Sequence, residues 1–315
     1  MDKEAKIYVA GHKGLVGSSL VRELNKEGYS NILTRSRNQL NLLNQNEATE
    51  FFNKEKPEYV FLAAARVGGI SANNTYSADF IYENLQVQNN VIHNAYLTKV
   101  KKLLFLGSSC IYPRNCPQPI KEEYLLSGIL ESTNEAYAIA KIAGIKLCQN
   151  YNKQYKTNFI CVMPTNLYGP NDSFDPDNSH VIPGLIQRIY KAKVKDTKSV
   201  TLWGTGTAYR EFLYIDDLAN ACVFLMNNYS SSEIINIGAG EDLTIKDLAQ
   251  TISKVIDYKG ELIFDHSMPD GTPKKLLDTN KLNTLGWTKK TNLITGLEKT
   301  YKWYLDNIAA IPAHQ

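Results

Sequence analysis

The sequence predicts an α/β protein built on a doubly wound parallel sheet, with a smaller, partly interleaved C-terminal lobe. Three observations predict this fold. Strand-like apolar runs alternate with helix-length segments through the first half of the chain, as in folds whose parallel strands are joined by helices. The first run leads directly into a glycine-rich turn that opens a helix. After Pro164 the alternation stops, and loops rich in Pro, Asn, Asp and Gly begin.

The elements of the first half follow one another in regular order. Each predicted strand is short and apolar, and a segment long enough for a helix separates most of them. The strands are KIYVAG (6–11), NILT (31–34), YVFLAAA (59–65), KLLFLGSS (102–109) and NFICVMP (158–164). Helices are expected from about Leu15, from near Gln45 to Asn53, within Asp79 to Thr98, and from about Glu135 to Tyr155.

The turn after the first strand reads AGHKGLVGSSL and contains Gly11, Gly14 and Gly17. Glycines permit a tight turn and let backbone amides approach a pyrophosphate, while the helix N-terminus favours negative charge. The GxxGxxG spacing differs from the GxGxxG fingerprint, and a purely structural turn is the alternative. Because a strand precedes the turn and a helix follows it, the turn predicts a dinucleotide site.

The end of the second predicted strand indicates which nicotinamide cofactor binds. An NAD site has Asp or Glu there for the ribose hydroxyls, whereas this chain has Arg35 and Arg37. Guanidinium groups suit a 2′-phosphate, and Lys13 in the glycine turn adds positive charge. We therefore expect NADP(H); the alternative is that these arginines only solvate the strand end.

The second half is expected to form a smaller lobe that closes over the carboxyl edge of the sheet. The run EIINIG (233–238) is expected to return to the sheet. This organisation gives a Rossmann domain over residues 1–165, with return segments near 211–240, and a second lobe over residues 166–315.

Charge and composition narrow the class of partner. The sequence has 35 Lys+Arg and 32 Asp+Glu, a net charge of +3, which is too small for a nucleic-acid or membrane footprint and favours a small molecule. The cysteines form no CxxC pair and the histidines are scattered, which predicts no metal site. Without a signal-peptide pattern or an apolar stretch long enough to span a bilayer, we expect a cytoplasmic protein.

Tyr137 and Lys141 lie four residues apart, on one face of a predicted helix. A neighbouring ammonium favours phenolate, so Lys141 is expected to lower the pKa of Tyr137. Ser108 or Ser109, after the fourth strand, can hydrogen-bond a substrate carbonyl while Tyr137 protonates it and a nicotinamide supplies hydride. Alone, a Tyr and a Lys at this spacing are more often a surface pair; with the glycine turn and the serines they favour a carbonyl reductase.

Eight segments together resemble one known family. They are AGHKGLVGSSL, LAAARVGGISANNTY, LLFLGSSCIYP, EAYAIAKIAGIKLC, MPTNLYGP, NSHVIP, WGTGTAYREFLYIDD and PDGTPKKLLD. They are similar to the GDP-L-fucose synthase family (GDP-4-keto-6-deoxy-mannose 3,5-epimerase-4-reductases) of the extended short-chain dehydrogenases/reductases, over about Lys6 to Tyr304. The resemblance implies NADPH-dependent reduction of a GDP-4-keto-sugar, with 3,5-epimerisation, by a homodimer that holds the cofactor in its larger lobe and the GDP-sugar in its smaller one.

The resemblance also implies roles for individual residues. Ser108, Tyr137 and Lys141 form the reductase trio, while Cys110 and His180 act as base and acid at the carbons beside the ketone. The expected cofactor residues are Gly11, Lys13, Gly14, Leu15, Val16, Gly17, Arg35, Arg37, Asn41, Leu42, Leu106, Gly107, Ser108, Lys141, Pro164, Asn166, Leu167 and His180. The expected substrate residues are Ser109, Cys110, Tyr137, Asn166, His180, Arg188, Trp203, Arg210, Asp270 and Lys275.

Departures from the family pattern leave the sugar open. Lys13 stands where the family usually has Arg, Arg66 where it has Lys, and the loop before His180 lacks the more usual histidines. The main alternative is a GDP-4-keto-heptose C4-reductase whose epimerisation is done by a separate enzyme. The fold is also compatible with a non-catalytic nucleotide-binding regulator, and with a dehydratase or 4-epimerase that retains NAD.

Overall fold

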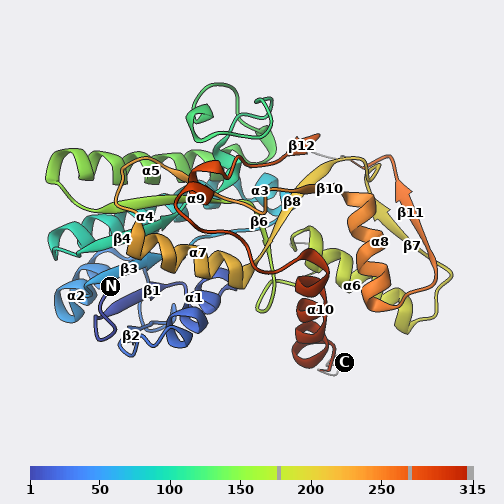
Figure 1. The fold of residues 1–315 in the computed structure, drawn as a ribbon, viewed down its shortest axis with the longest axis horizontal. Coiled ribbons are helices and arrows are strands. Elements are labelled where there is room, and N and C mark those ends of the chain that lie inside the picture. The colour runs from blue at the N-terminus through green and yellow to red at the C-terminus, as the bar shows by residue number, and fades with distance from the viewer. Residues whose placement is uncertain (176–178, 269–271, 311–315) are drawn as a thin grey trace.

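The centre of the fold is a six-stranded parallel sheet (Figure 1). The computed structural model describes residues 1–175, 179–268 and 272–310. In spatial order the strands are β2 (Ile32–Leu33), β1 (Ile7–Ala10), β3 (Tyr59–Leu62), β4 (Lys102–Leu106), β5 (Phe159–Pro164) and β9 (Ile235–Ile237). The predicted doubly wound parallel fold is confirmed. The strand order reverses between β1 and β3, and ligands of such sheets bind outside the carboxyl ends of the strands at that point.

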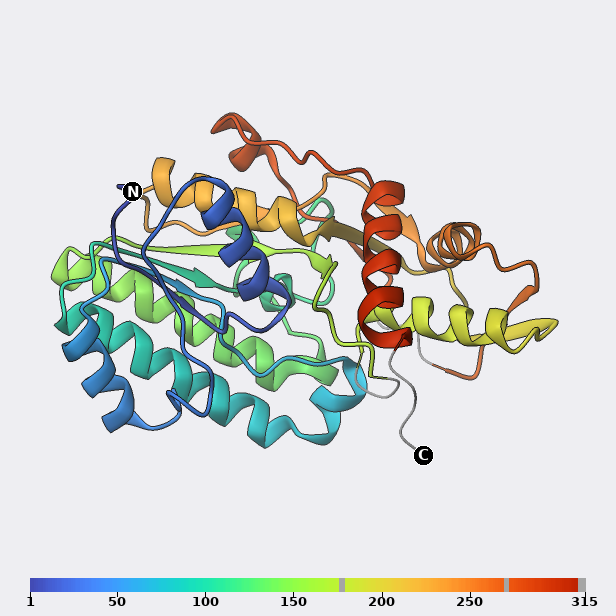
Figure 2. The ribbon, with the colours of Figure 1, turned by 90° about the horizontal axis from the view of Figure 1, so that it is seen from below.

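Two layers of helices cover the sheet, as Figure 2 shows from below. On one face α1 (Leu15–Lys26) packs against α7 (Ile215–Asn228); the other face carries α2 (Gln45–Glu55), α4 (Ser77–Leu97) and α5 (Glu135–Tyr155). Alternate residues of β1 supply the two cores, Ile7 and Val9 on the α1 side and Tyr8 and Ala10 on the α4 side. This alternation follows from the two-residue period of a strand that is buried on both faces.

The sixth strand comes from late in the chain. Strand β9 pairs in parallel with β5, with Ile235 opposite Val162 and Ile237 opposite Pro164. The run EIINIG therefore lies within the central sheet, beside the strand that ends at Pro164. The helix before it, α7, packs on α1, so the chain returns to both the sheet and one of its helical layers.

A second group of elements lies at one end of the sheet (Figure 1). Strand β8 (Tyr209–Tyr214) pairs with β6 (Asn166–Tyr168), β10 (Asp242–Thr244) and β12 (Lys274–Lys275), and β7 (Ser199–Trp203) pairs with β11 (Glu261–Asp265). Around them lie α6 (Val181–Val194), α8 (Ile245–Ile256) and α10 (Leu293–Tyr304), with the short helices α3 (Ile70–Thr75) and α9 (Asn280–Thr284) elsewhere. None of the helices within the described ranges combines the length and apolar character that crossing a bilayer requires.

A buried lysine joins the sheet to α7. Lys102, the first residue of β4, is 4% exposed. Its Nζ donates hydrogen bonds to the backbone oxygens of Leu225 (3.1 Å) and Met226 (2.7 Å), near the end of α7. Burial lowers the pKa of this ammonium from 10.5 to about 8, because the charged form is partly stripped of water.

Replacing Lys102 with methionine should remove a pH-dependent part of the stability. Between pH 10.5 and about 8 the unfolded chain binds a proton that native Lys102 releases, so the free energy of unfolding of the wild type rises with pH across that window. The rise from this residue is about 3 kcal/mol. Urea unfolding at both ends of the window measures it, with Lys54→Met, at an exposed position on α2, as control. Equal pH slopes for the wild type and Lys102→Met would contradict the expectation.

Candidate active site

The glycine turn lies between β1 and α1 at the point where the strand order reverses. Gly11 has a φ of +86°, a backbone conformation that side chains disfavour. A Cβ on Gly17 would lie 2.1 Å from the backbone oxygen of Gly11, so only glycine permits this close contact of helix and turn. Gly14 precedes α1, and no side chain caps the helix N-terminus. The turn therefore offers backbone amides and a helix dipole to an anionic group, which fits a dinucleotide pyrophosphate.

The positive groups at the end of β2 differ in their availability. Arg35 donates to Glu55 Oε1 (2.8 Å) and to the backbone oxygen of Thr34 (2.8 Å), so much of its hydrogen-bonding capacity is already used. Arg37 and Lys13 are exposed. Across the described residues neither of them forms an ion pair with a carboxylate. Of the two arginines named from the sequence, Arg37 is therefore the more available to a phosphate.

The other residues expected along the cofactor lie at the carboxyl ends of neighbouring strands. Leu106, Gly107 and Ser108 end or follow β4, Pro164 ends β5, Asn166 and Leu167 lie in β6, and Asn41 and Leu42 lie in the loop before α2. Leu15 and Val16 begin α1. Gly107 is tightly packed, since a Cβ there would lie 2.5 Å from Met163 Sδ. The sheet therefore brings these separate segments to one edge.

Tyr137 and Lys141 lie on α5, one turn apart and facing the end of β4. Lys141 is 4% exposed, and its Nζ donates to the backbone oxygen of Leu106 at 2.7 Å. The Nζ lies 5.7 Å from the centroid of the Tyr137 ring. Burial lowers the pKa of Lys141 to about 8.

The expected effect of Lys141 on Tyr137 is wrong. Burial raises the pKa of Tyr137, and the charge of Cys110 acts in the same direction, while a hydrogen bond with Ser108 opposes them. The ammonium is held by a backbone carbonyl rather than by the phenol, so desolvation of the phenolate dominates. Tyr137 is therefore protonated near neutral pH, which is the state that a proton donor requires.

Cys110 has the character of a reactive thiol. It lies in a short 3-10 turn, Ser109–Ile111, after β4, and its backbone N–H donates to Ser108 Oγ at 3.2 Å. Lys275 Nζ donates to Cys110 Sγ at 3.5 Å. Burial raises the pKa of the thiol, but the ammonium of Lys275, hydrogen bonds from Ser108 and Lys275, and the charge of Arg210 lower it by more. The net downward shift favours thiolate.

His180 precedes α6 and does not cap it with its side chain. The residue as a whole is exposed to solvent. Protein nevertheless surrounds the ring closely enough that desolvation lowers the pKa of the imidazole. A lowered pKa makes the protonated ring a stronger acid.

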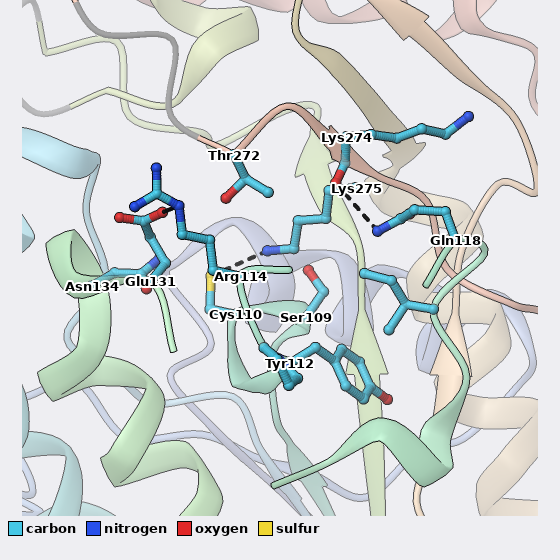
Figure 3. Close-up of a pocket in the computed structure, with 12 residues that line it drawn as sticks. Ser109, Cys110, Tyr112, Arg114, Gln118, Glu131, Asn134, Thr272, Lys274 and Lys275 are labelled. Atoms are coloured by element: carbon cyan, nitrogen blue, oxygen red, sulfur yellow. Dashed lines mark hydrogen bonds and ion pairs between the residues drawn. The ribbon is translucent and has the colours of Figure 1, made fainter. Parts of the chain in front are cut away.

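Cys110 opens into a cavity between the two groups of elements (Figure 3). Residues of the N-terminal part form one wall and residues of β12 and its approach form the other; among them are Ser109, Arg114, Asn134, Thr272 and Lys275. Asn134 Oδ1 is buried and accepts no hydrogen bond from the described residues. A ligand with a hydroxyl group would supply the missing donor.

The remaining substrate residues are spread along the C-terminal group. The Arg188 guanidinium lies 4.6 Å from the Trp203 ring centroid, in cation–π geometry, and Trp203 is 54% exposed. Arg210 donates to the backbone oxygen of Tyr209 and adds positive charge near Cys110. Asn166 donates to the backbone oxygen of Glu211 at 2.8 Å. Asp270 lies outside the described residues.

Several residues of the site were not found from the sequence. Gln118, Asn134 and Arg114 line the cavity. Glu211 accepts a hydrogen bond from the backbone N–H of Leu277, close in the chain to the lining residues Lys274 and Lys275. Asn236 accepts from the Tyr112 hydroxyl at 2.6 Å and donates to the backbone oxygen of Ile120. Polar residues such as these carry no local sequence signal, because long-range contacts alone give them their role.

A doubly wound sheet with this glycine turn and this tyrosine–lysine helix defines the extended class of short-chain dehydrogenases/reductases. Residues 7–238 match the NAD dependent epimerase/dehydratase family, and the chain belongs to that family.

The proteins similar to this chain include GDP-L-fucose synthases and a heptose reductase of known structure. The chain is similar to putative GDP-L-fucose synthase 2 of Arabidopsis thaliana, with 57% identity covering 98% of this chain and 94% of that protein. It is also similar to GDP-L-fucose synthase of Escherichia coli strain K12, with 51% identity covering 96% and 97%. GDP-mannoheptose C4 reductase from Campylobacter jejuni, solved with NADP bound, is 42% identical with a TM-score of 0.90, covering 97% of this chain and 99% of that one.

Proposed function

We propose that this protein reduces the C4 ketone of GDP-4-keto-6-deoxymannose with NADPH and epimerises C3 and C5, as a GDP-L-fucose synthase does. The observation that carries the proposal is the position of Ser108. Its hydroxyl interacts with both the Tyr137 phenol and Cys110. A proton donor for ketone reduction and a thiolate for proton removal therefore adjoin one hydroxyl, which suits two reactions at neighbouring carbons of one sugar.

The reduction step uses the protonated phenol of Tyr137. When bound, the reduced nicotinamide supplies a hydride to C4. Tyr137 donates its proton to the C4 oxygen, so the carbonyl becomes a hydroxyl, while the Ser108 hydroxyl orients that oxygen by hydrogen bonding. Lys141, whose pKa burial lowers to about 8, is mostly protonated at neutral pH, and its Nζ is held by the backbone oxygen of Leu106 at 2.7 Å.

The epimerisation step uses the two sides of the sugar ring. The Cys110 thiolate removes a proton from a carbon beside the ketone, and the electrons move onto the C4 oxygen to form an enolate. The hydroxyl groups of Ser108 and Tyr137 stabilise that oxygen. His180 returns a proton to the opposite face, which inverts the carbon.

NADPH is the proposed cofactor because positive charge is available at the end of β2. Arg37 and Lys13 are exposed near the glycine turn, and Arg35 supports the strand end through Glu55. Arginine suits a 2′-phosphate because its planar group can make two hydrogen bonds. The NADP bound in the heptose reductase structure supports the same choice.

Replacing Arg37 with serine should weaken NADPH binding and leave NADH binding almost unchanged. The variant loses a charge-assisted hydrogen bond to the 2′-phosphate, so the Kd for NADPH should rise about tenfold to a hundredfold. Titration of each reduced cofactor by fluorescence measures both constants, and NADH is the internal control. An equal loss for both cofactors, or none for NADPH, would refute the role of Arg37.

We further propose how the two parts of the chain share the substrate and cofactor. Residues 1–165, with the return segments near 211–240, would hold NADP(H), and residues 166–315 would hold the GDP-sugar. The Arg188–Trp203 pair and Arg210 supply positive and aromatic groups for a nucleoside diphosphate. The resemblance adds a homodimer, and five free thiols fit a reducing compartment such as the cytoplasm.

The proposal is tested by supplying GDP-4-keto-6-deoxymannose with NADPH and analysing the product by NMR. The expected product is GDP-L-fucose, formed with one equivalent of NADPH consumed. In deuterated water without NADPH, the substrate should take up deuterium at C3 and C5. No consumption of NADPH would refute the reductase, and reduction without deuterium uptake would limit the enzyme to ketoreduction.

A GDP-4-keto-heptose is the second candidate substrate. It is favoured by the similarity to the GDP-mannoheptose C4 reductase, although the GDP-L-fucose synthases share more identity with this chain. A panel of GDP-4-keto-hexoses and GDP-4-keto-heptoses, compared by kcat/KM, separates the two. A higher kcat/KM for the heptose, with no deuterium uptake, would replace the main proposal by this one.

A further inference from the structure

The side chain of Lys275 crosses from the C-terminal group of elements to the thiol of Cys110. The two residues are 165 positions apart in the chain, and Lys275 Nζ lies 3.5 Å from Cys110 Sγ. Figure 3 shows Lys275 pointing toward the sulfur while its neighbour Lys274 points away. Alternating directions are expected, since both residues belong to strand β12.

The two lysines also differ in what balances their charge. Lys274 pairs with Asp242 at 3.2 Å and lies over the Tyr209 ring. Lys275 pairs with no carboxylate among residues 1–175, 179–268 and 272–310. The sulfur of Cys110 is therefore the group within hydrogen-bond reach that can carry the matching negative charge.

The strand that carries Lys275 is held on both sides. Gln118 brackets it, donating to the backbone oxygen of Lys274 and accepting from the backbone N–H of Leu276 at 2.8 Å. On the other side β12 pairs with Tyr209–Arg210 of β8. The buried carboxylate of Glu211 accepts from the backbone N–H of Leu277 at 3.1 Å. These contacts fix the starting point of the Lys275 side chain.

Other charged and titratable groups face the same cavity. Arg210 adds a second positive charge near the thiol, and the Tyr137 phenol faces it from α5. Arg114 is compensated by Glu131, with 3.3 Å between Nε and Oε2. Lys275 lies within hydrogen-bond distance of the sulfur. Coulomb attraction to its ammonium and the hydrogen bond that it donates both favour the thiolate form of Cys110.

We propose that Lys275 is a positioning residue that keeps Cys110 as a thiolate. A residue of the C-terminal part of the chain thereby activates the catalytic base, Cys110, which belongs to the N-terminal part. The purpose of this pairing, proton removal beside the ketone, rests on the proposed function. The pairing itself requires no substrate. It can therefore be tested separately from turnover.

The test is the pH dependence of alkylation of Cys110 by iodoacetamide in the substrate-free protein. Cys148, Cys161 and Cys222 are buried, and every protein in the series carries Cys116→Ser to remove the remaining half-buried thiol. The wild-type midpoint should lie below the ordinary value of about 8.5, because thiolate is the reactive form. Lys275→Gln should raise the midpoint by about one unit and slow alkylation at about pH 7 roughly tenfold.

Matched variants separate a charge effect from a structural one. Lys275→Arg should retain the low midpoint, and Lys274→Gln, on the same strand but facing away, should leave it unchanged. A wild-type midpoint at or above about 8.5, or equal shifts in Lys274→Gln and Lys275→Gln, would overturn the proposal. Should Lys275→Gln fail to fold, a wild-type midpoint at or above about 8.5 would still overturn the proposal.

The alkylation experiment can fail or succeed independently of the proposed function. A midpoint that depends on Lys275, without turnover of any GDP-4-keto-sugar, would support the pairing and refute the proposed function. If the protein turns over the substrate and exchanges deuterium, but the alkylation midpoint is the same in the wild type and in Lys275→Gln, only the pairing is refuted. When both hold, Lys275→Gln should also move the pH profile of deuterium uptake upward, and Lys275→Arg should restore it.

Discussion

Tyr137→Phe should reduce the rate of NADPH-dependent ketone reduction about 10³-fold, within the range usual for the loss of a general acid. The variant removes only the phenolic hydroxyl, so ring packing against Phe80, at 6.4 Å between centroids, is preserved. The expected loss is therefore chemical rather than structural. The rate of NADPH consumption with GDP-4-keto-6-deoxymannose measures it.

The control for this variant is Tyr82→Phe, which alters a tyrosine that is 63% exposed on α4. It should consume NADPH at the wild-type rate. Deuterium uptake by Tyr137→Phe should fall by less than reduction does, because Ser108 still offers a hydroxyl to the enolate oxygen. Full reductase activity in Tyr137→Phe would mean that another group donates the proton.

Cys110→Ser should abolish deuterium uptake at C3 and C5 while leaving ketone reduction measurable. A serine hydroxyl is a far weaker acid than a thiol, so the variant offers no anionic base near neutral pH. Loss of about 10²–10⁴-fold in the exchange rate is expected. NMR of the substrate in deuterated water, without NADPH, follows the exchange.

A matched control is available in Cys116→Ser, which changes a half-buried cysteine whose pKa is raised by burial. It should exchange deuterium as the wild type does. With NADPH present, Cys110→Ser should yield a reduced sugar that keeps the original configuration at C3 and C5. If Cys110→Ser exchanges at the wild-type rate, a different residue removes the proton.

The parts of the fold that could be predicted follow from local rules. Gly11 and Gly17 stand at a strand–helix junction, where a positive φ at the first and a close backbone contact at the second require glycine. The apolar runs of β1, β3, β4 and β5 are buried on both faces, so each is continuous and easily recognised. Helix α5 begins and ends at the predicted residues, while α4 begins at Ser77, slightly before the predicted segment.

The parts of the site that could not be predicted depend on distant contacts. Arg35 and Arg37 look equivalent in the sequence, but Glu55, on α2, pairs with only the first of them. The pKa of Tyr137 depends on the balance between burial, the charge of Cys110 and the hydrogen bond with Ser108, and none of these follows from a four-residue spacing. These are properties of packed side chains, so the sequence pattern carries no trace of them.

Strand β9 makes the first half of the molecule dependent on chain that is synthesised much later. Until residues 235–237 arrive, β5 presents a row of unpaired backbone groups on a strand that is buried throughout in the finished protein. Such an edge is a template for pairing with other chains. A fragment ending near residue 165 should therefore aggregate when expressed alone, and the nascent protein must shield this edge until β9 leaves the ribosome.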